Sequence, residues 1–278
     1  MDSTSPLPSS IPYLVIPCCN EVQGLEKFVT KIIDTGVSIN ILLIDATSSD
    51  KTAREAQRLA KLGFPIEVID RPTKTGFESA CREGFKIALR RGATAIIEMD
   101  ADLSHNPDTI AQMLDQLDKG VSLAIGSTNV ARGCAQSLSR THLVISQIGT
   151  WYARKMLSLE IRDSKPRYRA FDANVLRTLD LTTLLADGFG TQIDMAQLIA
   201  GTGHLVSEIP IVYEPKSSDA SKAPHALISH ALNFFTLTGI RGRLREWRLG
   251  RPMIQSHMAM PERIHDWIDT RTAVASRN

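Results

Sequence analysis

The chain alternates two hydrophobic patterns between residues 11 and 126. Short continuous apolar runs are followed by longer stretches in which apolar residues recur every three or four positions. The continuous runs predict buried strands, and the recurring spacing predicts helices with one apolar face. Strands that alternate with helices favour an α/β fold, a mostly parallel sheet with helices on both faces. The predicted strands are residues 11–17, 41–45, 66–69, 95–99 and 122–125.

The helical spacing also predicts which side chains face the sheet. A third helix is expected over residues 79–90, and a fourth follows Pro107, whose fixed φ suits a helix start. Asp50 precedes the second helix and is expected to cap its N-terminus. The inward positions expected for the first two helices are Leu25, Phe28, Val29, Ile32, Ile33, Ala53, Ala56, Leu59 and Ala60.

The second half of the chain is less regular. We predict a polar loop over residues 163–169, a strand over 204–213, and helices over 138–159, 173–179 and 191–200. Residues 241–251 contain five arginines among apolar residues, a pattern that suits a solvated face or a weak contact with a membrane surface. The expected organisation is a flexible tail at 1–10, one domain at 11–240 and a basic accessory segment at 241–278.

The composition excludes several classes of protein. The formal net charge of +2, from 32 basic and 30 acidic residues, gives no reason to expect binding to nucleic acid. No apolar run approaches the roughly 18 residues of a membrane-spanning helix, so we expect a cytoplasmic protein with at most peripheral membrane contact. Four cysteines without paired spacing are expected to be reduced thiols.

Two carboxylates separated by one residue end the fourth predicted strand. Asp100 and Asp102 follow the apolar residues Ile96 and Ile97, and a turn then leads to Pro107. Where a strand breaks into a turn, two such carboxylates can converge on one cation. Mg²⁺ and Mn²⁺ favour oxygen ligands and complete their coordination with substrate phosphates and water. The pair therefore predicts a site for a divalent cation and a diphosphate.

Polar turns follow each of the first four predicted strands, and parallel strands place such turns along one edge of the sheet. The turns are Pro17-Cys18-Cys19-Asn20-Glu21, the segment from Asp45 to Thr52, the segment from Arg71 to Gly76, and Asp100-Ala101-Asp102. In this order they resemble the motifs of glycosyltransferase family 2, and most closely its dolichyl-phosphate mannosyltransferase branch. Later matches include the segments 187–190, 192–194 and 208–211.

The resemblance implies a GT-A fold and an inverting transfer from a UDP- or GDP-linked sugar. Residues 11–126 would form the nucleotide-sugar half and residues 127–240 the acceptor half. Asp187 and Asp194 would be the candidate catalytic bases. The divalent cation, Mg²⁺ or Mn²⁺, would be held by Asp102 and Asp100. The implied substrate-binding residues are Pro17, Cys19, Glu21, Ile44, Lys74, Asp100, Ala101, Asp102, Arg169, Lys216 and Lys222.

Several positions depart from the family's pattern. Ala46 replaces an acid in the second turn, and Thr128 and His142 replace arginines. The loop over residues 165–168 resembles the family's only at the aromatic residue. Since a phosphate acceptor is recognised through arginines, the expected acceptor is the hydroxyl or amine of a small or carrier-tethered molecule. The alternative keeps a polyprenyl phosphate, with Arg140, Arg167 and Arg169 replacing the lost cations.

Other functions remain as alternatives. A haloacid-dehalogenase-type phosphatase also carries two spaced aspartates, but after its first strand. A sugar nucleotidyltransferase has a glycine-rich phosphate loop after the first strand, which this chain lacks. The altered positions also allow a catalytically silent protein that binds nucleotide-sugars. The sequence leaves a homodimer open.

Overall fold

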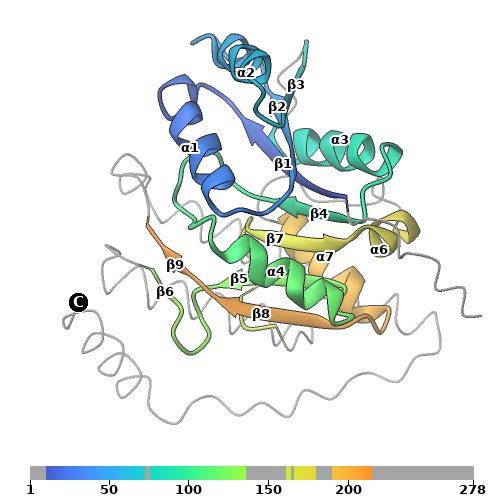
Figure 1. Ribbon diagram of the computed structural model, residues 1–278. Helices are drawn as coiled ribbons and strands as arrows, with labels where there is room; N and C mark the ends of the chain where they lie inside the picture. The colour runs from blue at the N-terminus through green and yellow to red at the C-terminus, as the bar shows by residue number, and fades with distance from the viewer. Residues whose placement is uncertain (1–10, 73–75, 136–160, 164–165, 180–189, 215–278) are drawn as a thin grey trace, which may run out of the picture. The chain divides into compact units, whose positions relative to one another are not determined.

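The computed structural model describes residues 11–72, 76–135, 161–163, 166–179 and 190–214, all of which lie in one compact unit. Its centre is a sheet of seven strands in the order β3-β2-β1-β4-β7-β5-β8 (Figure 1). Only β7 is antiparallel to its neighbours. The strands are β1 (Pro12–Cys18), β2 (Asn40–Asp45), β3 (Ile66–Asp70), β4 (Ala95–Glu98), β5 (Leu123–Ser127), β7 (Arg169–Asp172) and β8 (Val206–Pro210).

A second, two-stranded sheet pairs β6 (Cys134–Ala135) with β9 (Val212–Tyr213). The helices of the described unit are α1 (Val22–Asp34), α2 (Thr52–Lys61), α3 (Phe77–Arg90), α4 (Thr109–Asp118), α6 (Ala173–Thr178) and α7 (Gly190–Gly201). No helix among these residues is long and apolar enough to cross a membrane.

Helices cover both faces of the main sheet (Figure 1). Phe28 of α1 and Met113 of α4 belong to the same buried cluster as Leu14 of β1. Gly84 of α3 instead lies against Val15, the next residue of β1. Because successive strand residues point to opposite faces, α3 packs on the face opposite α1 and α4. The aromatic rings of Phe85 in α3 and Phe171 in β7 meet on that face, with centroids 5.5 Å apart.

The predicted organisation of the first half is confirmed. Each expected strand and helix up to residue 126 is present, with ends shifted by a few residues. Two of the inward positions are wrong, because Ile33 is 38% exposed and Ala60 also faces solvent. Asp50 does not occupy the cap position, which is Lys51. Its carboxylate instead accepts hydrogen bonds from the backbone N–H groups of Val22 and Thr52.

The second half differs more from the expectation. The predicted polar loop over residues 163–169 ends in β7, an interior strand of the main sheet between β4 and β5. The predicted strand over 204–213 is divided at Ile211 into β8 and β9, which pair in different sheets. The short helix near residue 173 and the helix from residue 191 are confirmed as α6 and α7. The helix expected over 138–159 and the basic segment after residue 240 lie outside the described residues.

Gly84 sets how closely α3 approaches the sheet. A Cβ atom built on Gly84 would lie 2.4 Å from Cγ1 of Val15 and 3.1 Å from Cγ1 of Ile44. We therefore expect Gly84→Ala to lower the free energy of unfolding by about 1–3 kcal/mol, because overpacking forces side chains or backbone to shift. Urea unfolding followed by circular dichroism measures this change.

Gly24 in α1 supplies the matched control. A Cβ there meets nothing within 4 Å. Gly24→Ala should raise stability by about 0.5–1 kcal/mol, because alanine loses less backbone entropy in a helix. Equal effects of the two substitutions would contradict the packing explanation.

Candidate active site

The turn that contains the two spaced aspartates begins where β4 ends, at Glu98. The Oδ1 atom of Asp102 accepts hydrogen bonds from the backbone N–H of Ser104 at 3.0 Å and from its hydroxyl at 2.5 Å. Leu103 between them has a φ of 61°, the left-handed conformation that reverses the chain. The turn is therefore fixed by its own side chains, and Oδ2 of Asp102 makes no hydrogen bond within the described part of the chain.

The turns after β1 and β2 are bonded to one another. The backbone N–H of Asn20 donates to the Ser48 hydroxyl at 2.9 Å, and its side-chain oxygen accepts from the Ser49 N–H, also at 2.9 Å. The hydroxyl of Ser48 in turn donates to Asp45, which is buried at the end of β2. Asp50 joins the same arrangement through Val22 at the start of α1. These bonds hold two loops together at the carboxyl edge of the sheet.

A pocket of about 330 Å³ opens between these turns and the start of α3. Its size suits a small polar ligand, and its place beyond the carboxyl ends of parallel strands is where α/β sheets bind ligands. It is lined by Pro17, Cys18, Cys19, Glu21, Ala46, Gly76, Phe77, Ala80, Asp100, Ala101, Asp102 and Arg167.

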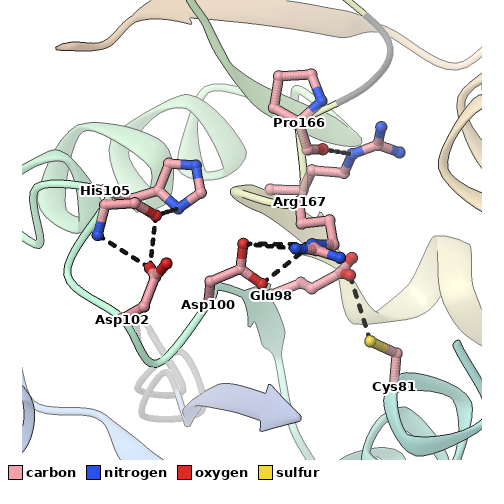
Figure 2. A network of polar contacts seen from close by, with 9 residues as sticks. Cys81, Glu98, Asp100, Asp102, His105, Pro166 and Arg167 are labelled. Carbon is pink, nitrogen blue, oxygen red and sulfur yellow. Dashed lines mark hydrogen bonds and ion pairs between the residues drawn. The ribbon is translucent and has the colours of Figure 1, made fainter. Parts of the chain in front are cut away.

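Arg167 reaches the pocket from the segment just before β7 and points toward Asp100 (Figure 2). Its Nε lies 3.0 Å from Oδ1 of Asp100, and its Nη2 donates to Oδ2 at 3.1 Å. The guanidinium carbon also lies 4.2 Å from the centroid of the Phe77 ring, within the range of a cation–π contact. Burial opposes the charge of Arg167, but the nearby Asp100 carboxylate raises its pKa.

Two buried ionisable residues face each other across neighbouring strands of the main sheet. Glu98 of β4 and Arg169 of β7 are direct cross-strand partners, and both are almost fully buried. The guanidinium of Arg169 donates to the backbone carbonyls of Pro166 and Gln192, each at 2.6 Å. Burial raises the pKa of Glu98 to about 7 and lowers the pKa of Arg169 to about 10. The Cys81 thiol donates to Glu98 at 3.3 Å, and its own pKa is raised by burial (Figure 2).

Comparison with known families identifies the chain. The model of the family described as Glycosyl transferase family 2 matches residues 13–179, more than half of the sequence. The chain belongs to glycosyl transferase family 2. The resemblance drawn from the four turns is thereby confirmed, and this protein is a glycosyltransferase.

Two bacterial relatives match this glycosyltransferase over most of its length. The polyprenol monophosphomannose synthase of Mycolicibacterium smegmatis is 34% identical, and the match covers 87% of this chain and 92% of the relative. The undecaprenyl-phosphate mannosyltransferase of Micrococcus luteus is 31% identical, with 82% and 94% covered. Both support the branch of the family that the turns resemble.

A solved structure shares the fold of the family 2 glycosyltransferase described here. The glucosyl-3-phosphoglycerate synthase of Mycobacterium tuberculosis aligns with a TM-score of 0.58 at 15% identity, covering 92% of this chain and 85% of that one. At this identity the likeness establishes the GT-A fold alone.

The glycosyltransferase brings much of the predicted site together. Six of the expected residues line the pocket, namely Pro17, Cys19, Glu21, Asp100, Ala101 and Asp102. Ile44 is fully buried in β2, and Asp194 lies in α7, so neither lines the pocket. Arg169 was expected to bind substrate, but its side chain is 0% exposed and its guanidinium holds two backbone carbonyls. Lys74, Asp187, Lys216 and Lys222 lie outside the described residues.

The pocket also contains residues that the sequence did not place there. The helix predicted from residue 79 begins at Phe77, and the ring of Phe77 lies beside Arg167. Arg167 was considered only as a replacement cation for the lipid-phosphate alternative. Ala46 and Gly76 line the pocket as well. The run of cations from Lys165 to Arg169 was the available signal for Arg167, but spacing alone does not say which of them reaches the pocket.

The donor set of the pocket fits a magnesium-type cation. Asp100 and Asp102 both face it, and both offer the oxygen ligands that Mg²⁺ and Mn²⁺ prefer. Within the described residues no group of three or more His, Cys, Asp or Glu side chains could hold a metal ion. Such a site suits a cation that takes one or two carboxylates and completes its coordination with substrate phosphates and water.

Proposed function

We propose that this family 2 glycosyltransferase transfers mannose from a nucleoside-diphosphate mannose to a polyprenyl phosphate. The observation that carries the proposal is the near full-length match to the polyprenol monophosphomannose synthase of Mycolicibacterium smegmatis. The name of the Micrococcus luteus relative combines the same sugar and the same class of lipid phosphate. Of the two acceptor classes that the sequence left open, the lipid phosphate is therefore the better supported.

Two carboxylates of the pocket are already engaged by other groups, which favours an acceptor that needs no general base. A hydroxyl or amine acceptor benefits from a general base, whereas a phosphate is already anionic at neutral pH. Asp100 is paired with Arg167, and Asp102 is bonded to the turn that it closes. Asp194, one of the two predicted bases, is not among the residues that line the pocket. A reaction that needs no base suits the engagement of Asp100 and Asp102.

The proposed reaction is one displacement at the sugar. The bond between the anomeric carbon and the diphosphate oxygen breaks, and an oxygen of the acceptor phosphate forms the new bond. A single displacement inverts the anomeric configuration. A divalent cation held by Asp102 and Asp100 would stabilise the negative charge on the leaving diphosphate. The turns after β1 and β2, with Pro17, Cys19 and Glu21, would hold the nucleoside.

The acceptor can be tested directly with purified protein. We expect GDP-mannose, Mg²⁺ or Mn²⁺ and a short-chain polyprenyl phosphate to give mannosyl-phosphoryl lipid, detected by mass spectrometry. UDP-glucose and UDP-N-acetylglucosamine serve as donor controls, and EDTA should stop the transfer if the cation acts as proposed. Asp187→Asn should leave the lipid product undiminished, because no base is required.

Soluble acceptors provide the contrary outcome. Efficient transfer to a soluble hydroxyl or amine, with none to the lipid phosphate, would exclude the proposed acceptor. A large loss of that soluble product in Asp187→Asn would then restore the acceptor class first expected from the sequence.

A further inference from the structure

The charge of the pocket is unfavourable for a phosphate-bearing ligand. Three acidic side chains line it, Glu21, Asp100 and Asp102, and among the described lining residues Arg167 alone is cationic. Both the donor and the acceptor of the proposed reaction carry phosphate groups, which these carboxylates would repel. A divalent cation offsets part of this repulsion, and Arg167 is the protein's own group placed to offset more.

The Arg167 guanidinium is fixed in place by its neighbours and is still accessible from the pocket. Asp100 fixes the guanidinium from one edge through Nε and Nη2, and Phe77 lies against it at 4.2 Å. A planar guanidinium held in this way loses little side-chain entropy when it forms further hydrogen bonds. Its side chain is still 33% exposed, so a ligand in the pocket can reach it.

The nearby Arg169 shows the contrast between a structural arginine and an available one. Arg169 is completely enclosed, and its guanidinium is engaged by two backbone carbonyls. Within the described part of the chain, Arg167 bonds only to Asp100 and its Nη1 makes no hydrogen bond. That nitrogen carries two N–H donors suited to the oxygens of a phosphate.

We propose that Arg167 is a phosphate-binding residue of this pocket, oriented by Asp100 and Phe77, and that its Nη1 donates to an anionic phosphate oxygen of the substrate. That oxygen belongs either to the donor diphosphate or to the acceptor phosphate, and the two sources can be separated by experiment. Arg167 has this role only if the substrates carry phosphate, so the assignment rests on the proposed function.

Binding measurements on Arg167→Met test the role. The probes are GDP and UDP with Mn²⁺, and farnesyl phosphate, each titrated calorimetrically. Loss of a charge-assisted hydrogen bond should lower the affinity for the ligand whose phosphate Arg167 contacts by about tenfold to a hundredfold. A lower affinity for the nucleotide would identify the donor diphosphate as the group that Arg167 contacts. A lower affinity for farnesyl phosphate, with the nucleotide affinity within about twofold of the wild type, would identify the acceptor phosphate. Arg167→Lys should lie between Arg167→Met and the wild type, because lysine keeps the charge without the planar fork.

Arg58→Met is the matched control. Arg58 is also a partly exposed arginine bonded to carboxylates, but it lies in α2 and does not line the pocket. It should leave every affinity unchanged. Unchanged affinities in Arg167→Met and Arg167→Lys, with a melting temperature close to that of the wild type, would overturn the role and leave Arg167 as a static partner of Asp100.

The same titrations separate this role from the proposed function. A wild type that binds nucleotide but transfers nothing to a lipid phosphate would refute the proposed acceptor, while the nucleotide titrations would still decide the role of Arg167. A wild type that binds none of these phosphates would refute both.

Discussion

Asp102→Asn is expected to abolish metal-dependent nucleotide binding and to reduce turnover roughly a thousandfold. The amide oxygen of asparagine can still accept the two hydrogen bonds from Ser104, so the turn should keep its shape. What is lost is the negative charge that holds the cation next to the leaving diphosphate. Isothermal titration with GDP or UDP, with and without Mn²⁺, measures the binding, and initial rates with the accepted donor measure the turnover.

Asp115→Asn controls for the loss of one carboxylate elsewhere. Asp115 is exposed on α4, and among the described residues its one ion pair is with Lys119, just past the end of that helix. Its removal should change neither nucleotide affinity nor rate. If Asp102→Asn kept its metal-dependent affinity, the assignment of Asp102 to the cation would be refuted.

Arg169→Met is expected to lower the free energy of unfolding by about 3 kcal/mol or more, because the buried Glu98 loses the positive charge that faces it from the next strand. Two backbone carbonyls, those of Pro166 and Gln192, also lose their donor.

The loss of unfolding free energy in Arg169→Met should grow with pH. Burial raises the pKa of Glu98 from 4.5 to about 7 in the native state. Below that pH the native state keeps Glu98 protonated, and above it the carboxylate ionises and requires Arg169. Urea unfolding at pH 6 and at pH 8 measures both effects.

Arg177→Met is the control for this substitution. Arg177 donates to the backbone carbonyl of Ala93 and to the side chain of Asn174, without a buried carboxylate as partner. Arg177→Met should lower the free energy of unfolding by about 1 kcal/mol, equally at pH 6 and pH 8. If Arg169→Met lowered the free energy of unfolding equally at pH 6 and pH 8, the ionised Glu98 would not depend on the positive charge of Arg169.

The sequence predicted the first half of the fold because its hydrophobic periods are clear there. Continuous runs such as Ile41 to Ile44 are buried throughout, and the helix positions Leu25, Phe28 and Ile32 recur at helical spacing. Six residues of the pocket were named from the family resemblance, and they lie together because turns after parallel strands meet at one edge of the sheet. Local patterns were sufficient wherever the fold repeats one strand–helix unit.

Strand β7 was missed because its burial depends on a partner remote in sequence. The segment from Lys165 to Arg169 is rich in cations, and such a run normally indicates solvent. Arg169 can be buried because Glu98 lies opposite it in β4, and two backbone carbonyls accept hydrogen bonds from its guanidinium. The sequence up to Glu98 contains no signal that β4 will pair with residues 169–172. Arg167 was hidden for the same reason, because its place in the pocket follows from where β7 begins.

The position of β7 also fixes an order of events during synthesis. Strands β4 and β5 are not hydrogen-bonded to one another, because β7 lies between them. Until residue 172 has left the ribosome, β4 therefore pairs with β1 on one side and has an unpaired edge on the other. Strand β5 cannot join the main sheet before β7 is available to pair with it. Open apolar edges invite pairing with other chains, and pairings remote in sequence form slowly. The nascent chain is thus open to aggregation at a stage when residues 11–126 have already been made.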